Sequence, residues 1–517
     1  MISSLFHHIF FQASTTGMGF ARTRPRFLLR LIVTVLLCAP ASSQTFESVE
    51  RQIQTRVLPN GMKFIVLERR NAPVASFHVY ADVGSVNESY GITGISHLLE
   101  HMAFKGSRTV GTKDYAAESK ILDRIDAVYE ELRAEQGKAE PDAARIAGLQ
   151  KQFDDLEKRA KEYVVNNEYI DMMMREGDAG VNAYTSEDAT QYVNSLPSNR
   201  LEFWMAMTSD RFLNPVFREF YKERDVVMEE RRLGLETQPT GRLVEDFQAA
   251  AFKAHPYHHG VIGHMSDLQS ITRRDVADYF AKYYGPSNLT VAIVGDVKPD
   301  EVFRLADLYF ARIPSGPKPE PVRTREPEQW GERRVAVLAK AQPYLIIGYR
   351  APDVRHKDSR ALEGLANILG QGRSSRLFTS MVKEKKVAVS ASASTGFPGD
   401  KFPNLFVFFA VPAAGKTSAD CQAAIEEEIE RIKRESVTED ELTKFKRRSI
   451  KNLLDQMTNN ASMAALLTYS DVVLGGYGKL FDQIDEIKAL TADDIRRVAD
   501  KYLVNKNRTI GEIIPEQ

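Results

Sequence analysis

Runs of apolar residues separated by polar turns predict a chain built from strands and helices in two segments. In the first segment, three β-rich apolar runs predict strands at 62–67, 74–83 and 289–296. A second segment with the same mixture of elements begins near Arg333. Between them, 313–332 holds five prolines among polar residues, which is the composition of a linker. We therefore expect a first domain over 46–312 and a second over 333–517.

A charged helical hairpin is predicted within the first domain, at about 115–165. Gly137 to Pro141 turn the chain between two arms that carry apolar residues at helical spacing. These positions are Leu122, Ile125, Tyr129 and Leu132 on one arm and Ile146, Leu149, Phe153 and Leu156 on the other. The segment contains no motif that carries chemistry, so we expect it to be structural or to bind a partner.

An internal repeat links the two segments. Thr272–Thr290 aligns without a gap onto Thr491–Thr509, an offset of 219 positions. In both copies a helix is followed by Lys-Tyr and then by a strand. A short match could arise by chance, but the same switch from helix to strand near the end of both domains favours duplication.

Bulk composition describes a globular protein of more than one domain. The chain has 517 residues, of which 43% are hydrophobic and 27% charged, and this length exceeds one ordinary core. The 69 basic and 70 acidic residues nearly cancel. This balance gives no indication of nucleic acid or an anionic membrane as a partner.

The first 43 residues have the pattern of an export signal, because arginines at 22, 24, 26 and 30 precede a short apolar run, Leu31–Ala39. The run is too short for a permanent membrane anchor, and a start at Met18 would give a more ordinary signal length. Removal of the signal would take Cys38 away and leave Cys421 without a disulfide partner in the chain. These features favour the bacterial periplasm, with secretion as the alternative.

The pentapeptide His97-Leu98-Leu99-Glu100-His101 is the most informative sequence in the chain. On a helix, His97 and His101 lie one turn apart on the same face, where both imidazoles can bind one metal ion. Glu100 lies beside them, close enough to take a proton from a water. The order H-x-x-E-H inverts the H-E-x-x-H signature of zinc peptidases. The alternative is a helix that carries two histidines by chance.

A third ligand is needed, because catalytic zinc binds three protein side chains and keeps one position open. The best candidates are the carboxylates of 223–230. Glu223 and Glu230 are two helical turns apart and share one face to within about 20°, whereas Glu229 points roughly 100° away. An exposed surface carboxylate is the alternative interpretation of Glu223.

Together these motifs resemble the inverzincin peptidases, the pitrilysin and insulinase (M16) family, and especially its short bacterial members related to the mitochondrial processing peptidase. The matching motifs occur in the family's order: Leu58–Gly61, Val83–Ser85, His97–Met102, Asn182–Thr185, Glu223–Glu230 and Ser374–Phe378. The resemblance implies that Glu230 is the third ligand of one zinc ion per chain and that Glu223 supports the site from close by.

The resemblance also implies an α+β fold in which two homologous domains, each a mixed β-sheet flanked by helices, face each other as a clamshell. The implied activity is a zinc-dependent endopeptidase that cleaves peptides or unfolded segments, with Glu100 as general base. Asn182, Ala183, Tyr184 and Thr185 would form the edge strand that pairs with the substrate backbone. A plain edge strand is the alternative.

Two other functions are compatible with the sequence. The chain could be a non-catalytic assembly or core subunit, although such relatives usually have a degraded metal motif. It could also be a metal-binding scaffold without turnover. Zinc content and Glu100-dependent cleavage of a peptide would separate these functions.

The second half departs from the family's pattern. Active members often carry an arginine and a tyrosine, seven residues apart, that bind substrate and stabilise the oxyanion. Aligned on Ser375–Phe378, these positions are Val382 and Val389, and neither valine can donate a hydrogen bond. We therefore expect a dimer, and in particular a heterodimer in which a related chain without the metal motif supplies this pair.

The first half departs as well. His101 and Glu230 are farther apart along the chain than is usual in the family, and the excess matches the hairpin at 115–165. As an insertion, the hairpin should leave the site intact and could gate the substrate chamber or dock a partner. The cluster of histidines at 255, 258, 259 and 264 has no carboxylate or cysteine at ligand spacing, so we expect no second metal there.

Overall fold

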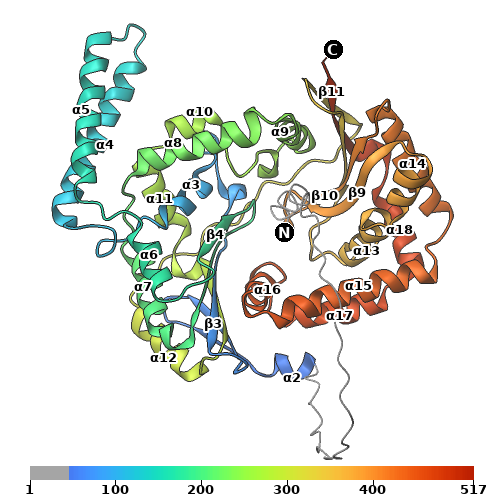
Figure 1. The fold of residues 1–517 in the computed structure, drawn as a ribbon, viewed down its shortest axis with the longest axis horizontal. Helices are drawn as coiled ribbons and strands as arrows, with labels where there is room; N and C mark the ends of the chain where they lie inside the picture. Colours follow the sequence, from blue (N-terminus) through green and yellow to red (C-terminus); the bar gives the residue numbers. More distant parts are fainter. Residues whose placement is uncertain (1–45, 517) are drawn as a thin grey trace, which may run out of the picture. The chain divides into compact units, whose positions relative to one another are not determined.

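Two mixed β-sheets organise residues 46–516, the part of the chain described in this computed structural model (Figure 1). The first sheet has the order β1-β2-β6-β3-β5-β4, with bounds Ile53–Val57, Lys63–Glu68, Leu289–Gly295, Val74–Ala81, Thr190–Pro197 and Asn182–Thr185. The second has the order β7-β11-β8-β10-β9, with bounds Arg333–Ala339, Arg508–Pro515, Tyr344–Ala351, Asn404–Pro412 and Ala388–Phe397. The predicted export signal at 1–43 lies outside the described residues.

Helices surround both sheets. In the first half they are α3 (Ile95–Met102), α4 (Tyr115–Gln136), α5 (Ala143–Lys161), α6 (Glu168–Arg175), α7 (Leu201–Leu213), α8 (Phe220–Arg231), α9 (Pro239–Ala251), α10 (Met265–Ser270), α11 (Arg273–Tyr283) and α12 (Pro299–Tyr309). In the second half they are α13 (Ser359–Gly370), α14 (Ser418–Arg434), α15 (Glu439–Thr458), α16 (Asn460–Val472), α17 (Lys479–Ala489) and α18 (Ala492–Tyr502). The short helix α2 (Phe46–Glu50) precedes them. None of the helices in the described residues is long and apolar enough to cross a bilayer.

The strand order of the second sheet recurs in the first, which has β1 as an additional edge strand, and this agreement confirms the predicted duplication of a mixed αβ unit. β6 lies between β2 and β3 and runs parallel to β2; β11 lies between β7 and β8 and runs parallel to β7. The helices that precede these two strands, α11 and α18, both begin with a reciprocal Thr–Asp capping box. The helix boundaries Arg273 and Tyr283 recur 219 positions later at Ala492 and Tyr502.

β3 is buried on both faces, which explains why its sequence is a continuous apolar run and not a strict alternation. Phe77 and Val79 point into the core of the first half, where Phe77 stacks on Trp204 of α7 with ring centroids 4.4 Å apart. On the opposite face, Tyr80 packs with Val473, which follows α16 of the second half. The first sheet is therefore covered partly by its own helices and partly by a helix of the other half.

A helix of the first half packs on the second sheet in the same way. α9 of the first half packs on β7 and β11 (Figure 1), and its Phe247 is fully buried. A Cβ atom at Gly348 of β8 would lie 2.7 Å from the Phe247 ring, so glycine is needed for this close approach. Each half thus contributes one helix to the sheet of the other, which ties the two homologous units together.

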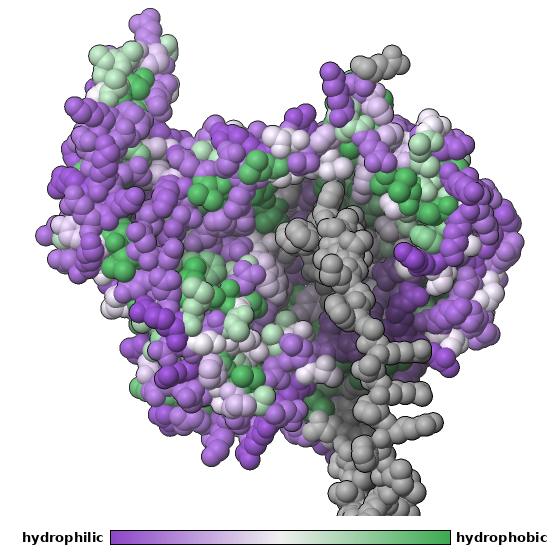
Figure 2. All heavy atoms as spheres, viewed as in Figure 1, coloured by the Kyte–Doolittle hydropathy of each residue, from purple (hydrophilic) through white to green (hydrophobic). Residues whose placement is uncertain are grey.

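The predicted helical hairpin is present as α4 and α5, which pack side by side (Figure 1). Asp114 and Asp142 cap the two helices by accepting hydrogen bonds from backbone N–H groups of the first turn. The apolar positions named from the sequence are mostly buried between the arms. The surface of the hairpin is largely hydrophilic (Figure 2).

The proline-rich segment at 313–332 has no regular secondary structure and is tied to both halves. The Glu326 carboxylate accepts hydrogen bonds from the backbone N–H groups of residues 253–255, which follow α9, at 2.8 to 3.0 Å. It also accepts one from the Arg350 guanidinium of β8, at 2.8 Å. This segment is an anchored connection and not a free spacer.

Candidate metal centre

The H-x-x-E-H sequence lies on α3, as its spacing predicts. Leu98 and Leu99 are buried in the core of the first half, and α3 packs against α8 and β4. The Glu88 carboxylate accepts hydrogen bonds from the backbone N–H groups of Gly94 and Ser96, each at 2.8 Å. Because these N–H groups have no partner within the helix, Glu88 fixes the start of α3.

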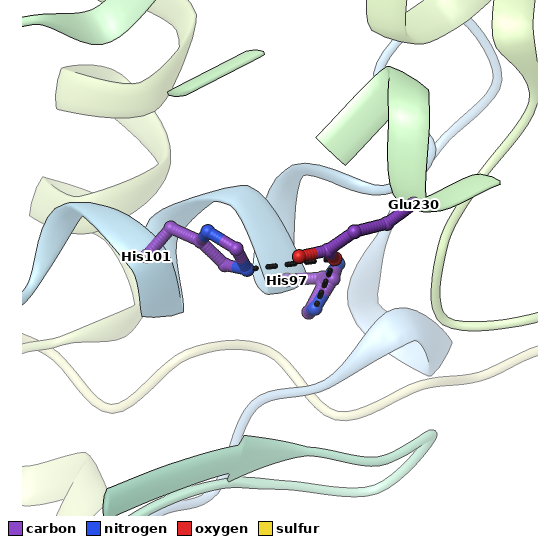
Figure 3. Close-up of side chains that lie close together, drawn as sticks. All are labelled: His97, His101 and Glu230. Atoms are coloured by element: carbon purple, nitrogen blue, oxygen red, sulfur yellow. Dashed lines mark ion pairs between the residues drawn. The ribbon is translucent and has the colours of Figure 1, made fainter. Parts of the chain in front are cut away.

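His97, His101 and Glu230 point toward one another from two helices (Figure 3). The Oε2 atom of Glu230 lies 3.8 Å from His97 Nε2 and 3.7 Å from His101 Nε2. The donor atoms of a tetrahedral zinc site are about 3.3 Å apart, given bonds of about 2.0–2.1 Å. Both distances from the exposed Glu230 carboxylate exceed this value, so the ligand side chains would have to move closer together to bind zinc. Among the described residues, this is the only group of three such side chains that could hold a metal ion.

The two imidazoles have different protonation behaviour. Burial lowers the pKa of His97 to about 3, so its ring is neutral near pH 7 and available as a metal ligand. Burial also lowers the pKa of His101, but the surrounding carboxylates, led by Glu223 and Glu230, outweigh burial and raise it. The Nδ1 atom of His97 is buried and has no hydrogen-bond partner among the residues that the structure describes.

Glu223 lies two turns before Glu230 on α8 and reaches the other side of the His101 ring. Its Oε2 atom is 3.6 Å from His101 Nδ1, and its Oε1 atom is 2.5 Å from Lys105 Nζ. Burial would raise the pKa of Glu223, but the contacts with His101 and Lys105 outweigh burial and lower it to about 2. Glu223 is therefore an ionised, half-buried carboxylate and not a free surface group.

Glu100 lies on the side of α3 that faces β4. The Thr185 hydroxyl donates a hydrogen bond to Glu100 Oε2 at 2.6 Å. Burial raises the pKa of Glu100, and the Thr185 hydrogen bond and the His101 ring act against this rise. Asn182, Ala183, Tyr184 and Thr185 make up β4, which among the described strands pairs with β5 alone and forms an edge of the first sheet.

Sequence reasoning missed two residues around this centre. Glu88 caps α3, and Lys105 contacts Glu223; neither was singled out by the motif. Lys105 lies four positions after His101, so a continued helical spacing was the one available signal. For Glu88 the signal was weaker still. A loop separates Glu88 from α3, whereas a capping residue usually stands directly before its helix.

Val382 and Val389 lie in the second half, on a helical turn over Phe378–Glu384 and on β9. Val389 is 58% exposed, and neither side chain supplies a polar atom. The histidines at 255, 258 and 259 contact one another and Tyr257, and His255 Nδ1 accepts the backbone N–H of Tyr257 at 3.2 Å. These contacts shape a loop of the first half.

Two family descriptions match the chain. One, Insulinase (Peptidase family M16), matches residues 64–124 and 158–264. The other, Peptidase M16 inactive domain, matches 270–449. All of the residues around the candidate metal centre fall in the first match. The interruption between its two parts falls within α4 and α5, in agreement with an inserted hairpin.

Individual proteins are similar to the chain over most of its length. The protein named Zinc protease PqqE from Helicobacter pylori is 28% identical, over 92% of this chain and 96% of that protein. The protein named Probable mitochondrial-processing peptidase subunit beta from Arabidopsis thaliana is 24% identical, over 90% of this chain and 79% of that protein. The crystal structure of a protease from Helicobacter pylori superposes with a TM-score of 0.75 at 26% identity, covering 90% of this chain and 99% of the other.

Proposed function

Because the chain belongs to the M16 insulinase family of peptidases, we propose that it is a zinc-dependent endopeptidase acting on peptides or unfolded protein segments. The observation that carries this proposal is the convergence of His97, His101 and Glu230, whose ligand atoms lie within 4.8 Å of one another. The histidines come from α3 and the carboxylate from α8, so the arrangement exists only in the folded chain.

The donor set suits one zinc ion per chain. Two imidazole nitrogens and one carboxylate oxygen are the ligands of many catalytic zinc sites, which keep a fourth position open. Zinc held by these residues would lower the pKa of a water and polarise the scissile carbonyl. Glu223, 3.6 Å from His101 Nδ1, would hold that ring in the orientation needed for Nε2 to face Glu230.

Glu100 is the proposed general base. It precedes His101 directly, and the Thr185 hydroxyl orients its carboxylate. Glu100 would take a proton from the attacking water while the oxygen of that water bonds to the peptide carbon. It would then give the proton to the leaving amine nitrogen as the C–N bond breaks. The peptide is cleaved with the net addition of one water, and Glu100 returns to its starting state.

The outer edge of β4 is the proposed substrate-binding surface. Within residues 46–516 this strand pairs with β5 alone, so the backbone groups of Asn182, Ala183, Tyr184 and Thr185 on the other side can pair with an extended peptide. The Thr185 contact with Glu100 puts that edge beside the proposed base. Recognition through the main chain favours broad specificity and requires an unfolded substrate segment.

A second, related chain completes the proposed enzyme. By the family resemblance, Val382 and Val389 occupy the positions at which active relatives bind substrate and stabilise the oxyanion, and neither valine can donate a hydrogen bond. We propose a dimer, as a heterodimer with a family member that lacks the metal motif. The arginine-rich and apolar pattern of 1–43 supports export to the periplasm.

The proposal is tested by zinc content and peptide cleavage. The protein purified from its native cell should contain one zinc per chain and should cleave a generic fluorogenic peptide. Glu100→Gln keeps the shape of the side chain but cannot accept the proton, so it should retain zinc and lose about 10²- to 10⁴-fold in kcat. A preparation that holds no zinc, or a Glu100→Gln variant with undiminished turnover, would refute the proposal.

A further inference from the structure

Arg218 is a buried arginine whose five N–H groups all have acceptors. Its Nε donates to Glu118 Oε1 at 2.9 Å, and its Nη2 donates to Glu118 Oε2 at 3.3 Å and to the Ser107 carbonyl at 2.6 Å. Its Nη1 donates to the carbonyls of Lys105 and Val110. Arg218 is 1% exposed and Glu118 is 0% exposed. This pair is therefore a charge-balanced and fully hydrogen-bonded element of the interior.

The acceptors of Arg218 come from two separate segments, and Arg218 itself belongs to a third. The carbonyls lie in the loop 105–111, which follows α3. The carboxylate lies in the first turn of α4, where the hairpin begins. Arg218 stands two residues before α8. One guanidinium thus joins the end of the helix that carries the histidines, the base of the hairpin and the start of the helix that carries Glu230.

The loop 105–111 is folded closely around this guanidinium. Gly106 and Gly111 have positive φ angles of 88° and 86°, which other residues rarely adopt. A Cβ atom at Gly111 would lie 2.8 Å from Arg218 Nη1, and one at Gly106 would lie 2.2 Å from the Val110 carbonyl oxygen. The loop conformation and the position of Arg218 therefore depend on each other.

Lys105 connects Arg218 to the metal centre. Its carbonyl accepts from Arg218, and its Nζ lies 2.5 Å from Glu223 Oε1 and 3.4 Å from Glu219 Oε2. Glu223 in turn contacts the His101 ring. A shift of the loop would move Lys105, and the change would pass through Glu223 to a proposed zinc ligand.

We propose that Arg218, balanced by Glu118, is a positioning residue that sets the separation of α3 and α8 and thereby the geometry in which His97, His101 and Glu230 bind zinc. This inference rests on the proposed function. The inference gives the base of the hairpin a role in the metal centre, in addition to any role that the rest of α4 and α5 has. Arginine is required, because the ammonium group of lysine cannot reach three carbonyls and a carboxylate from one fixed point.

The test compares Arg218→Lys with a matched control, Arg376→Lys. Arg376 is 7% exposed and binds Glu441 through Nε and Nη2 at 2.7 and 2.9 Å, but it lies in the second half. Zinc affinity is measured by competition with a chromophoric chelator, and the thermal midpoint and kcat/KM are measured beside it. Both variants should have a lower thermal midpoint than the wild type. Arg218→Lys alone should weaken zinc binding, by about tenfold, and lower kcat/KM.

Equal zinc affinity in Arg218→Lys, Arg376→Lys and the wild type would overturn the inference and leave the proposed function intact. A wild type that binds no zinc would instead overturn the proposed function, and this inference with it. If Arg218→Lys does not fold, Glu118→Gln replaces it, because glutamine keeps an acceptor oxygen but removes the balancing charge. Glu118→Gln should weaken zinc binding to an extent between the wild type and the expected effect of Arg218→Lys. Unchanged affinity in a folded Glu118→Gln would count against the inference.

Discussion

His78 on β3 and Thr468 on α16 are hydrogen bonded, with 2.8 Å between His78 Nδ1 and Thr468 Oγ1. The other ring nitrogen, Nε2, lies 3.3 Å from the Tyr184 hydroxyl of edge strand β4. One buried imidazole therefore connects the sheet of the first half, its edge beside Glu100, and a helix of the second half. Burial lowers the pKa of His78 to about 3, so this connection is uncharged near pH 7.

The low pKa of His78 predicts a loss of stability in weak acid. The unfolded chain binds a proton at this histidine below about pH 6.5, whereas the folded chain does not until about pH 3. Between these values the unfolded state holds more protons, so the free energy of unfolding falls as the pH falls. From pH 6.5 to pH 5 the contribution of His78 is about 2 kcal/mol.

His78→Asn removes this titration and can keep one hydrogen bond to Thr468. Urea unfolding midpoints of both proteins between pH 7 and pH 5 test the prediction. The variant should be less stable at pH 7, and its stability should decline less steeply toward pH 5. Parallel decline of the two proteins would mean that His78 does not stay neutral in the folded state.

The Thr185 hydroxyl should affect turnover more than substrate binding. Thr185→Ala leaves the backbone of β4 unchanged but removes the donor to Glu100. We expect kcat to fall about tenfold, equivalent to about 1.4 kcal/mol, with KM little changed. Thr185→Ser keeps the hydroxyl and should recover most of the loss. A rise in KM at constant kcat would instead assign Thr185 to substrate binding.

Local and periodic features of the fold could be predicted from the sequence. The α3 pentapeptide, the two arms of the hairpin and the duplicated helix-to-strand segment depend on residues only a few positions apart. Spacing of three, four or seven residues therefore determined which face each side chain occupies. The segment 182–185, which has the bounds of β4, was expected from the family resemblance and not from its own pattern.

Contacts between distant residues could not be predicted in the same way. His78 and Thr468 are 390 positions apart, and Arg218 and Glu118 are 100 apart. Taken alone in the sequence, each of these residues looks like an ordinary surface or core residue, and nothing near it indicates its partner. Only the packing of β3 against α16, and of the hairpin base against the start of α8, makes them partners. The same applies to Lys105 and Glu223, which meet because α3 and α8 cross.

Removal of zinc should lower the thermal stability of the protein. An ion that binds the folded state alone stabilises it by about 4 kcal/mol at a thousand times its dissociation constant. A chelator should therefore lower the thermal midpoint of the wild type. Glu230→Gln removes the carboxylate ligand, so the chelator should have little effect on this variant. Glu229→Gln is the matched control, because Glu229 is the neighbouring carboxylate and pairs with Arg232 at 2.9 Å.

In Glu229→Gln the shift on chelation should equal that of the wild type. A full shift in Glu230→Gln would mean that another side chain completes the metal site. If both variants lost the shift of the thermal midpoint equally, metal binding would depend on the total charge at this end of α8. It would then not depend on the position of the Glu230 carboxylate in particular. The comparison therefore tests the assignment of Glu230 without measuring activity.

The isolated chain should be a weak peptidase that gains activity from a second chain. Val382 and Val389 cannot stabilise an oxyanion, and loss of one oxyanion donor costs about 10²- to 10³-fold in rate. The chain co-purified with its partner from the native cell should therefore show a kcat/KM higher by about that factor than the chain produced alone, at equal zinc content. If the partner supplies the missing donors, Glu100→Gln in this chain should abolish the activity of the pair. Full activity of the zinc-loaded chain alone would show that a group other than the expected arginine and tyrosine stabilises the transition state.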